Sequence, residues 1–537
     1  RKWKKYTQLQ KLKLELDIEG ICDVCLCYAW IDQENIIRLQ GDNKVVYHKQ
    51  NADRETILLE YPTCPNGVIA YFRIFSNSEK TILYQANYQT TCENLALNEV
   101  KIAIGICTFR REEFVEKNLR LLKENIIYNP SSALYGNLHI FVSDNGQTLE
   151  EIKEEHLDIF HNKNAGGSGG FTRCMIEAKK QEEEKKFTHI ILMDDDILLD
   201  PNVLERTYIF LQFLKDEHKE AMIGGSMLIL NKPYQQFENA ALYRKGMLSF
   251  KNKNIDLRTF RNVIQNENIF DPNYNAWCYC CMPLSKIKWD NLPLPLFIHM
   301  DDVEYGARNN FEVITVNGIG VWHPFFANQR GASIVYYDVR NKLIVMSELG
   351  GRLIDEYALE WLEIFYRSIF NYDYERTLAA CQAIEDFCKG IDEFKQIEPV
   401  AFNQTLSKYN KSWEEADDEL RSRIDNTQSV PYFSFNGLLK NYLLPSKRKE
   451  IVVDCNISDA FPYRAKQVTL VNQTTGKKCI YKKDFRQMIK CKLKCRKAKK
   501  LIRTKLYDVS IEWKDRIHEI TNIDFWEKYL QLEKGEK

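Results

Sequence analysis

Three consecutive carboxylates, Asp194, Asp195 and Asp196, directly follow a run of four apolar residues, Ile190 to Met193. The apolar run is typical of a buried strand, so the acids stand at the carboxyl end of that strand. Alternate side chains of an extended segment point the same way, so Asp194 and Asp196 can share one divalent ion. Such an ion can neutralise a leaving diphosphate. A solvated acidic loop is the alternative for a bare Asp-x-Asp pattern.

A glycine-rich segment, Asn164 to Gly170, leads directly into a predicted helix. Glycines let the backbone approach a ligand closely, and free N–H groups at the start of a helix favour phosphate. The segment lacks the lysine of a P-loop and the glycine spacing of a dinucleotide-binding fingerprint. Alone it would be interpreted as a flexible loop, but its position between two predicted strands of one sheet indicates a phosphate-binding turn.

A second acidic cluster, Asp301, Asp302 and Glu304, lies within the segment from Ile298 to Gly306. One carboxylate of such a cluster can remove the proton of an attacking hydroxyl while a leaving group departs on the opposite side. Asp302 or Asp301 can do this, and Glu304 can hold the base or the molecule that carries the hydroxyl. The alternative is a helix start with acidic residues in its first turn.

His323 follows Trp322 and a strand-like segment from Val313 to Val321. A lone histidine is usually a packing or hydrogen-bonding residue. Because this one follows a strand of the same predicted domain, it can also supply the imidazole that completes a two-carboxylate metal site.

The chain from Lys101 onward alternates between predicted strands and helices. Strands are predicted over 102–107, 138–142 and 190–193, and helices over 111–124, with Phe114, Leu119 and Leu122 inward, and 170–186. Asp200 and Pro201 read as an N-cap and the first helical position of another helix. This alternation indicates a mostly parallel sheet covered by helices, with ligands at the carboxyl ends of strands. Thr108, Asp144 and Asp194 all stand at such ends.

Two further regions flank the alternating one. Short apolar strands and turn residues over 1–97 predict a β-sandwich or open barrel. Helical spacing of apolar residues predicts a mainly helical region beyond about Tyr337, with a β excursion near 467–481. We therefore expect a multidomain α/β protein: an N-terminal β-sandwich over 1–97, a central domain over 98–345 and a mainly helical domain over 346–537.

Bulk composition excludes several classes of protein. The chain of 537 residues carries 75 basic and 75 acidic residues, so no global charge favours nucleic acid. No apolar run of about eighteen residues is present, and the start of the chain lacks the apolar segment of a secretory signal. The sixteen cysteines lack paired zinc-ligand spacing, so we interpret them as core thiols of a protein in the reducing cytoplasm.

Taken in order, these segments resemble the bacterial galactofuranosyltransferase type of the family 2 glycosyltransferases. The resemblance covers roughly residues 100 to 345, and its motifs are 106–111, 143–146, 164–171, 193–196, 224–227 with Glu238, 301–306 and 322–323. The Gly-Gly-Ser-Gly-Gly-Phe and Asp-Asp-x-Glu-Tyr-Gly elements are specific, whereas the aspartate triplet is shared by many transferases. The resemblance implies a GT-A (Rossmann-like) fold for the central domain.

The resemblance also implies a role for each matching residue. Asp194, Asp196 and His323 would hold Mn²⁺ or Mg²⁺, and Asp302 would be the catalytic base. The residues expected to bind the uridine diphosphate sugar donor are Thr108, Arg111, Asp144, Asn164, Gly167 and Asp195, and those on the acceptor side are Glu238, Trp277, Asp301 and Glu304.

The activity implied is an inverting, metal-dependent transfer of galactofuranose from UDP-galactofuranose to a cell-surface glycan, with a lipid-linked acceptor at the inner face of the cell membrane. Cys278 stands where the family has a second tryptophan, and Pro324 follows His323. Both differences fall on the acceptor side, so the resemblance defines the acceptor less well than the donor. A rhamnosyl or other nucleotide-sugar donor, or an inactive glycan-binding protein, are the alternatives. Homo-oligomer formation is left open.

A basic stretch lies outside this central region. From Lys477 to Lys505 there are fourteen Lys or Arg residues and a single acid, Asp484. A solvated helical face is one reading and nucleic acid another. Because apolar residues such as Phe485 and Leu493 are interspersed, the stretch also suits a basic amphipathic element on anionic lipid, which is the partner that we expect.

Overall fold

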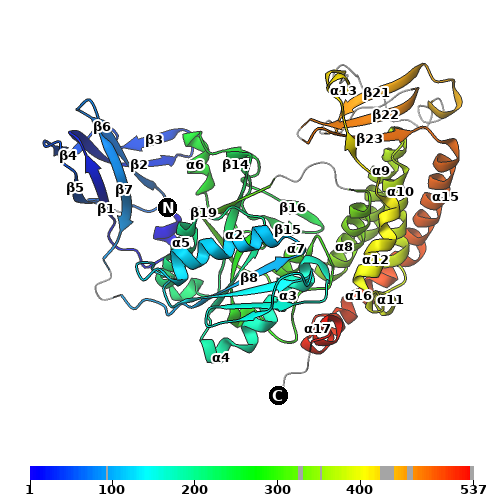
Figure 1. The fold of residues 1–537 in the computed structure, drawn as a ribbon, viewed down its shortest axis with the longest axis horizontal. Coiled ribbons are helices and arrows are strands. Elements are labelled where there is room, and N and C mark those ends of the chain that lie inside the picture. Colours follow the sequence, from blue (N-terminus) through cyan, green and yellow to red (C-terminus); the bar gives the residue numbers. More distant parts are fainter. Residues whose placement is uncertain are drawn as a thin grey trace.

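The computed structural model describes most of the chain, and Figure 1 shows β-rich, mixed and helical groups of elements following one another along the sequence. The described residues are 1–63, 65–91, 95–324, 331–350, 353–423, 441–455, 464–473 and 475–532. The predicted mixed α/β architecture is confirmed. The domain boundaries at 97 and 345 stay predictions.

Two antiparallel sheets near the N-terminus share one hydrophobic core. One has the order β5-β1-β7 and the other β3-β2-β4 with β6 also on β2. Leu14, Leu16 and Ile18 alternate along β1 and are fully buried, as expected for one face of a strand. The strands are β1 (Lys13–Glu19), β2 (Cys22–Ile31), β3 (Ile37–Gln40), β4 (Val45–Lys49), β5 (Glu55–Glu60), β6 (Ile69–Ser76) and β7 (Ile82–Gln89), and helix α1 (Lys2–Tyr6) precedes them.

The central sheet has ten strands in the order β10-β11-β9-β8-β12-β18-β13-β14-β17, with β19 also paired to β13. Its strands are β8 (Ile102–Thr108), β9 (Leu138–Asp144), β10 (Ile152–Lys153), β11 (Leu157–His161), β12 (His189–Asp194), β13 (Met222–Ile229), β14 (Lys232–Glu238), β17 (Ile255–Asp256), β18 (Tyr279–Pro283) and β19 (Val313–His323). A separate hairpin joins β15 (Leu242–Arg244) and β16 (Met247–Ser249).

The prediction of a mostly parallel sheet is wrong for the sheet as a whole. Strands β11, β9, β8 and β12 are parallel, as are β13 and β19. However, β18 runs antiparallel to both β12 and β13, and β10, β14 and β17 are antiparallel as well. The five residues of β18 are all buried, and a short apolar run of this kind has no pattern that reveals its direction.

Helices cover both faces of the parallel strands. Ile102, Ile104 and Ile106 of β8 point to a core formed with α2 and α5, whereas Ala103 points to a core formed with α3 and α17. The helices around this sheet are α2 (Glu112–Leu122), η1 (Lys123–Ile127), α3 (Gly166–Lys180), α4 (Glu182–Lys185), α5 (Pro201–Phe213), η2 (Asp216–His218), α6 (Phe260–Asn266), η3 (Leu284–Lys286) and α7 (Asp301–Arg308).

These helices agree with the sequence-based expectations at one cap and differ at one buried face and one helix start. Asp200 caps α5 by accepting a hydrogen bond from the backbone of Asn202, as predicted. The inward position predicted for Phe114 is wrong, because that side chain is exposed and Val115 is buried in its place. Helix α3 begins at Gly166 rather than Gly170, so most of the glycine-rich segment is its first turn.

The C-terminal part is mainly helical, as predicted, and carries a four-stranded sheet in the order β20-β23-β22-β21. Its helices are α8 (Ser333–Leu349), α9 (Ile354–Tyr366), η4 (Arg367–Asn371), α10 (Tyr374–Phe387), α11 (Ile391–Lys395), α12 (Pro399–Leu406), η5 (Ser407–Tyr409), α13 (Asp418–Ser422), α15 (Phe485–Leu501), η6 (Ile502–Leu506), α16 (Tyr507–Arg516), η7 (Ile517–Ile520) and α17 (Ile523–Leu530). Its strands are β20 (Glu414–Glu415), β21 (Arg448–Asp454), β22 (Ala465–Asn472) and β23 (Lys477–Lys482).

Among the described residues every cysteine is a free thiol, and all but Cys107 and Cys455 are buried, which confirms their interpretation as core thiols. None of the helices that the structure describes has the length and apolar character needed to cross a bilayer.

Candidate active site

Two carboxylates and an imidazole converge at the carboxyl ends of β12 and β19. His323 Nε2 lies 3.5 Å from Asp194 Oδ2 and 3.3 Å from Asp196 Oδ1. One ligand atom from each residue lies within 4.8 Å of the other two. The backbones of Leu198 and Trp322 exchange two hydrogen bonds, which hold the segment after the aspartate triplet against the end of β19. The structure thus brings together the three residues predicted as metal ligands.

The donor atoms of this cluster suit a divalent cation. Two carboxylates and a neutral imidazole are a common ligand set for divalent metal ions. Asp196 Oδ1 is buried, and its contact with His323 Nε2 at 3.3 Å lacks hydrogen-bond geometry, so this oxygen suits a cation held between the two residues. Burial lowers the pKa of His323, but Asp194 and Asp196 raise it by more, so the net shift is upward. The same negative field that attracts a proton attracts a metal ion.

Asp195, the middle residue of the triplet, turns away from this cluster. Its carboxylate accepts hydrogen bonds from Thr108 Oγ1 at 2.7 Å and from Arg111 at 3.0 Å. Burial raises the pKa of Asp195, which Thr108 and Arg111 partly offset. Arg111 also pairs with Asp196 at 2.7 Å and remains half exposed. The guanidinium therefore connects the candidate metal ligands to the open side of the site.

The glycine-rich helix start is fixed by backbone geometry. Gly166 has a φ of +72°, and a Cβ there would overlap the carbonyl oxygen of Phe297. Asn164 Oδ1 accepts a hydrogen bond from the Gly166 N–H at 3.0 Å. Asn145 donates to the Gly166 carbonyl at 3.0 Å, a role that sequence reasoning missed. At Gly167, by contrast, the nearest atom to the position of a Cβ is Oδ2 of Asp301 at 3.8 Å among the described residues, so this glycine faces that acid with room between them.

Asp144 holds the loop after β9. It is fully buried, and its carboxylate accepts backbone hydrogen bonds from Gly146, Thr148 and Leu149. Three such bonds occupy most of its acceptor positions. Its predicted contact with the donor stays a prediction.

The second acidic cluster opens helix α7. Asp301 lies beside Gly167, and burial, with a contribution from the charge of Asp194, raises the pKa of Asp301 to about 6. Burial and the charge of Asp301 raise the pKa of Asp302 well above its ordinary range. Phe297, His299 and Met300 just before the helix all have positive φ values. Such backbone conformations are rare for these residue types and concentrate at functional sites.

Asp302 faces a second buried acid. The hydroxyl of Tyr274 donates to Glu238 at 3.3 Å and also interacts with Asp302. Burial raises the pKa of Glu238. Asp302 and Glu238 therefore share one side of the site with Tyr274, whereas Asp301 lies on the side of the glycine-rich helix. Tyr274 was not identified from the sequence, because an isolated tyrosine in a loop has no distinguishing pattern.

The other two residues predicted to bind the acceptor are embedded in the protein. Glu304 is fully buried, pairs with Arg308 and accepts a hydrogen bond from the backbone of Leu294. Trp277 is 4% exposed and packs edge-on against Phe171 and Tyr305. Acceptor contact by either residue stays a prediction.

Comparison with known proteins provides evidence independent of this geometry. Residues 103–273 match the model of the family described as "Glycosyl transferase family 2". The chain is 24% identical over 444 residues to galactofuranosyltransferase GlfT2 of Mycobacterium tuberculosis, an alignment that covers 77% of this chain and 67% of that protein. For the protein of the same name from Mycolicibacterium smegmatis, identity is 25% over 324 residues, covering 55% of this chain and 48% of the relative. The chain is therefore a glycosyltransferase whose residues 103–273 match family 2, and it resembles the two mycobacterial galactofuranosyltransferases over a longer part of its length.

Proposed function

We propose that the protein transfers galactofuranose from UDP-galactofuranose to a hydroxyl of a glycan, with inversion at the anomeric carbon, and that the central region has the GT-A fold. The observation that carries the proposal is the meeting of two acidic groups at one end of the central sheet. The cluster of Asp194, Asp196 and His323 suits a cation, and Asp302 with Glu238 suits an acceptor hydroxyl. The open first turn of α3 lies beside Asp301 in the same site.

In this proposal each residue has a chemical task. Mn²⁺ or Mg²⁺ held by Asp194, Asp196 and His323 would neutralise the negative charge of the leaving diphosphate. The backbone N–H of Gly167 in the first turn of α3 and the guanidinium of Arg111 would bind phosphate oxygens. Thr108 and Asp195 orient that guanidinium from behind.

The transfer itself uses the second acidic group. The acceptor hydroxyl attacks the anomeric carbon on the face opposite the diphosphate, and the new C–O bond forms as the bond to the diphosphate breaks. The proton of the hydroxyl passes to Asp302, whose raised pKa makes it a stronger base than an ordinary carboxylate. Glu238, held by Tyr274, binds the acceptor beside it.

Two alternative functions make different demands on the same site. A different nucleotide sugar, such as a rhamnosyl donor, would use the same metal and base. A catalytically inactive glycan-binding protein has no need of either, so the presence of three convergent metal ligands and a buried acid pair favours catalysis.

The decisive experiment is a donor panel. Purified protein with Mn²⁺ and a galactofuranose-terminated acceptor is incubated with UDP-galactofuranose, UDP-galactopyranose and a rhamnosyl donor, and nucleotide diphosphate release is measured. Release should occur with UDP-galactofuranose and should need both Mn²⁺ and acceptor. Release with only the rhamnosyl donor would identify the alternative, and none with any donor would favour a binding protein.

A membrane-bound acceptor is the second part of the proposal, and the outer face of α15 supports it. Phe485, Ile489 and Leu493 recur at four-residue spacing and are 48%, 39% and 58% exposed. A buried face of the same helix packs through Met488 and Cys491 into a core that includes residues of η4, β21 and β22. Helix α15 lies at the outer edge of the helices in Figure 1.

Exposed cations surround this apolar stripe. Arg486, Lys490 and Lys500 are all exposed on α15, and Asp484, its N-cap, is the single acid in the whole basic stretch. Apolar side chains flanked by basic ones on one helix face suit anionic lipid, where each basic residue contributes about 1 kcal/mol. Contact with the inner face of a cell membrane would bring the catalytic site to a lipid-linked glycan.

A further inference from the structure

The C-terminal helix α17 leaves the helical region and returns to the central sheet. Figure 1 shows it below α16, near the strands and helices of the central region. Trp526 and Leu530 of α17 are buried in the same core as Phe171 of α3 and Trp277. From its contacts we propose that α17 is a brace of the active site, and that Trp526 is the positioning residue through which it sets the glycine-rich helix against helix α7. The proposal deepens the proposed function and rests on it for the identity of the reaction.

One side of α17 contacts the start of α3. Gly169 has the side chains of Leu530 and Trp526 within 4 Å of the position that a Cβ would take. Lys163, next to Asn164, donates a hydrogen bond to the Tyr529 carbonyl at 3.0 Å. Lys180 at the other end of α3 pairs with Glu527 at 3.2 Å. Helix α17 therefore holds the glycine-rich helix at both of its ends.

The other side of α17 contacts the segment 289–294. The indole N–H of Trp526 donates to the Pro293 carbonyl at 3.0 Å, and Trp526 itself is fully buried. The backbone N–H of Leu292 donates to Thr521 at 2.6 Å, and that of Ile523 donates to Trp289 at 2.7 Å. Three hydrogen bonds of this kind fix the segment relative to α17 in both position and direction.

The segment 289–294 in turn holds helix α7, which carries Asp301 and Asp302. Arg308 donates to the Leu292 carbonyl at 2.8 Å and also to the side chain of Asn291. Glu304 pairs with Arg308 and accepts from the Leu294 N–H at 3.3 Å. Buried Glu304 thus acquires a task that its sequence motif did not reveal: it links the base helix to the segment that Trp526 holds.

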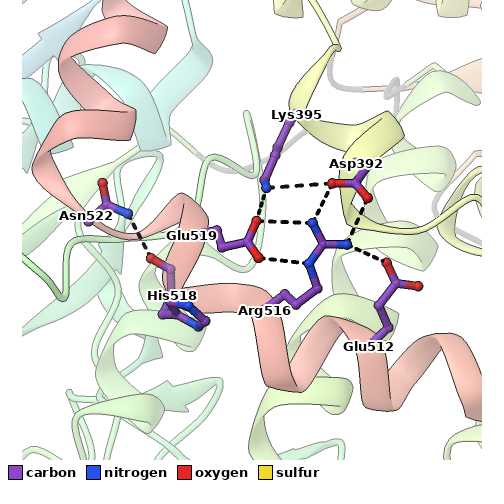
Figure 2. Close-up of polar contacts among 7 residues, drawn as sticks. All are labelled: Asp392, Lys395, Glu512, Arg516, His518, Glu519 and Asn522. Carbon is purple, nitrogen blue, oxygen red and sulfur yellow. Dashed lines mark hydrogen bonds and ion pairs between the residues drawn. The ribbon is translucent and has the colours of Figure 1, made fainter.

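The start of α17 is fixed from the side of the helical region. Figure 2 shows Arg516 between Asp392, Glu512 and Glu519, with Lys395 joining Asp392 and Glu519. Asn522 caps α17 by accepting from the Phe525 N–H at 2.9 Å and donates to the His518 carbonyl at 2.9 Å. The brace is therefore anchored outside the catalytic region before it crosses into it.

The consequence is geometric. In the proposed reaction the donor diphosphate lies near the start of α3 and the base lies on α7. The distance between them must stay fixed, because a misplacement of 1 Å can lower the rate about 10²-fold. Trp526→Phe preserves an aromatic ring in the core but removes the N–H donor, which leaves the Pro293 carbonyl unpaired. Helix α7 should shift relative to α3 without loss of the fold.

A matched control exists in the neighbouring helix. Trp513 of α16 is equally buried, and its indole N–H donates to the Phe387 carbonyl at 3.4 Å, away from the catalytic segments. Trp526→Phe should lower kcat about tenfold and leave KM for the donor within about twofold, whereas Trp513→Phe should leave both unchanged. The melting temperatures of the two variants should fall by similar amounts. If both variants lose kcat equally, or neither does, the proposal is overturned.

Two further measurements separate this proposal from the reaction assignment. In wild-type protein, amide hydrogen exchange should be slow in 164–170 and in 297–304; Trp526→Phe should accelerate both segments, and Trp513→Phe neither. These exchange rates test the positioning role of α17 even if the protein transfers sugar from no donor. If transfer occurs, the double variant Glu304→Gln with Trp526→Phe should lose less kcat than the two single variants predict by addition of their free-energy changes. The reason is that both residues act on the segment 289–294. Full additivity, or unchanged exchange in Trp526→Phe, would contradict the brace.

Discussion

The Nε2 atom of His323 lies 3.3 Å from Oδ1 of Asp196, although His323 ends β19 and Asp196 follows β12, two strands that are not neighbours in the sheet. Two hydrogen bonds between the backbones of Leu198 and Trp322 bring the ends of those segments together. Asp196 uses its other oxygen to bind Arg111. The carboxylate thus stands between a candidate metal ligand and the guanidinium that faces the open side of the site.

The first prediction concerns this carboxylate. Asp196→Asn preserves the shape of the side chain but removes the charge, so metal affinity should fall by more than about 100-fold, the upper range for residues that only support a ligand. Metal-dependent stabilisation of the protein by UDP should disappear with it. Calorimetric titration of Mn²⁺ and a thermal melt with UDP and Mn²⁺ measure the two effects.

The matched control for that experiment is Asp200→Asn. Asp200 follows the triplet closely but caps α5, and asparagine caps helices equally well. This variant should bind Mn²⁺ and UDP as the wild type does. Wild-type transfer in excess chelator, or normal Mn²⁺ affinity in Asp196→Asn, would show that the cluster is not a metal site.

The candidate metal ligands were predictable because each stands at the end of an apolar run typical of a strand, and the carboxyl ends of parallel strands meet at one edge of a sheet. The same reasoning placed Thr108 at that edge, where it holds Asp195. Tyr274 and Asn145 were not predictable, because their importance comes from what lies beside them in space: Glu238 in one case and the Gly166 carbonyl in the other.

Long-range packing set the other limits. The direction of β18 depends on its path between β12 and β13, which a five-residue apolar run does not encode. Phe114 and Val115 both fit an amphipathic helix, and only the position of the sheet decides which one is buried. The packing of α17 against the central core was also not predictable, because a helical pattern does not show which element the helix will pack against.

The second prediction concerns membrane contact. Replacing Phe485, Ile489 and Leu493 by serine should weaken binding to vesicles that contain anionic phospholipid, because their exposed apolar surface would no longer enter the interface. Wild-type binding should also decrease as salt rises, since exposed charges are screened beyond about 8 Å at physiological ionic strength. Vesicle co-sedimentation measures both.

Leu58 and Leu83 provide a control surface for this experiment. They are 55% and 42% exposed on the N-terminal strands, outside the basic stretch. Their replacement by serine should leave vesicle binding unchanged. Equal binding of wild type to neutral and anionic vesicles, or no binding to either, would exclude the proposed role of α15.

The third prediction concerns pH and His189, the first residue of β12. Burial lowers the pKa of His189 to about 4, below its ordinary 6.5. Between these values the unfolded chain binds a proton that the folded protein does not, so the free energy of unfolding falls as the pH falls from 6.5 to about 4. The shift corresponds to about 3 kcal/mol. Denaturant unfolding at pH 6.5 and pH 4 measures the loss of unfolding free energy between these two values. The loss should be smaller for His189→Gln than for wild type by about that amount. The control His161→Gln, at an exposed site, should behave as wild type.

The last prediction concerns the base. Asp302 interacts with Tyr274 and Glu238, whereas Asp301 lies beside Gly167, so substitution of the two neighbours should have different kinetic effects. Asp302→Asn preserves shape but cannot accept the proton of the acceptor, so kcat should fall about 10²–10⁴-fold with little change in donor affinity. Asp301→Asn should alter donor affinity more than kcat.

The pH dependence of kcat gives a second test of the base. Because the pKa of Asp302 is raised, wild-type kcat should begin to decline at a higher pH than it would with an ordinary carboxylate as base. This decline should be absent from the residual activity of Asp302→Asn. Steady-state kinetics of both variants across pH measure these effects. If Asp302→Asn transfers sugar at the wild-type rate while Asp301→Asn does not, the base is Asp301.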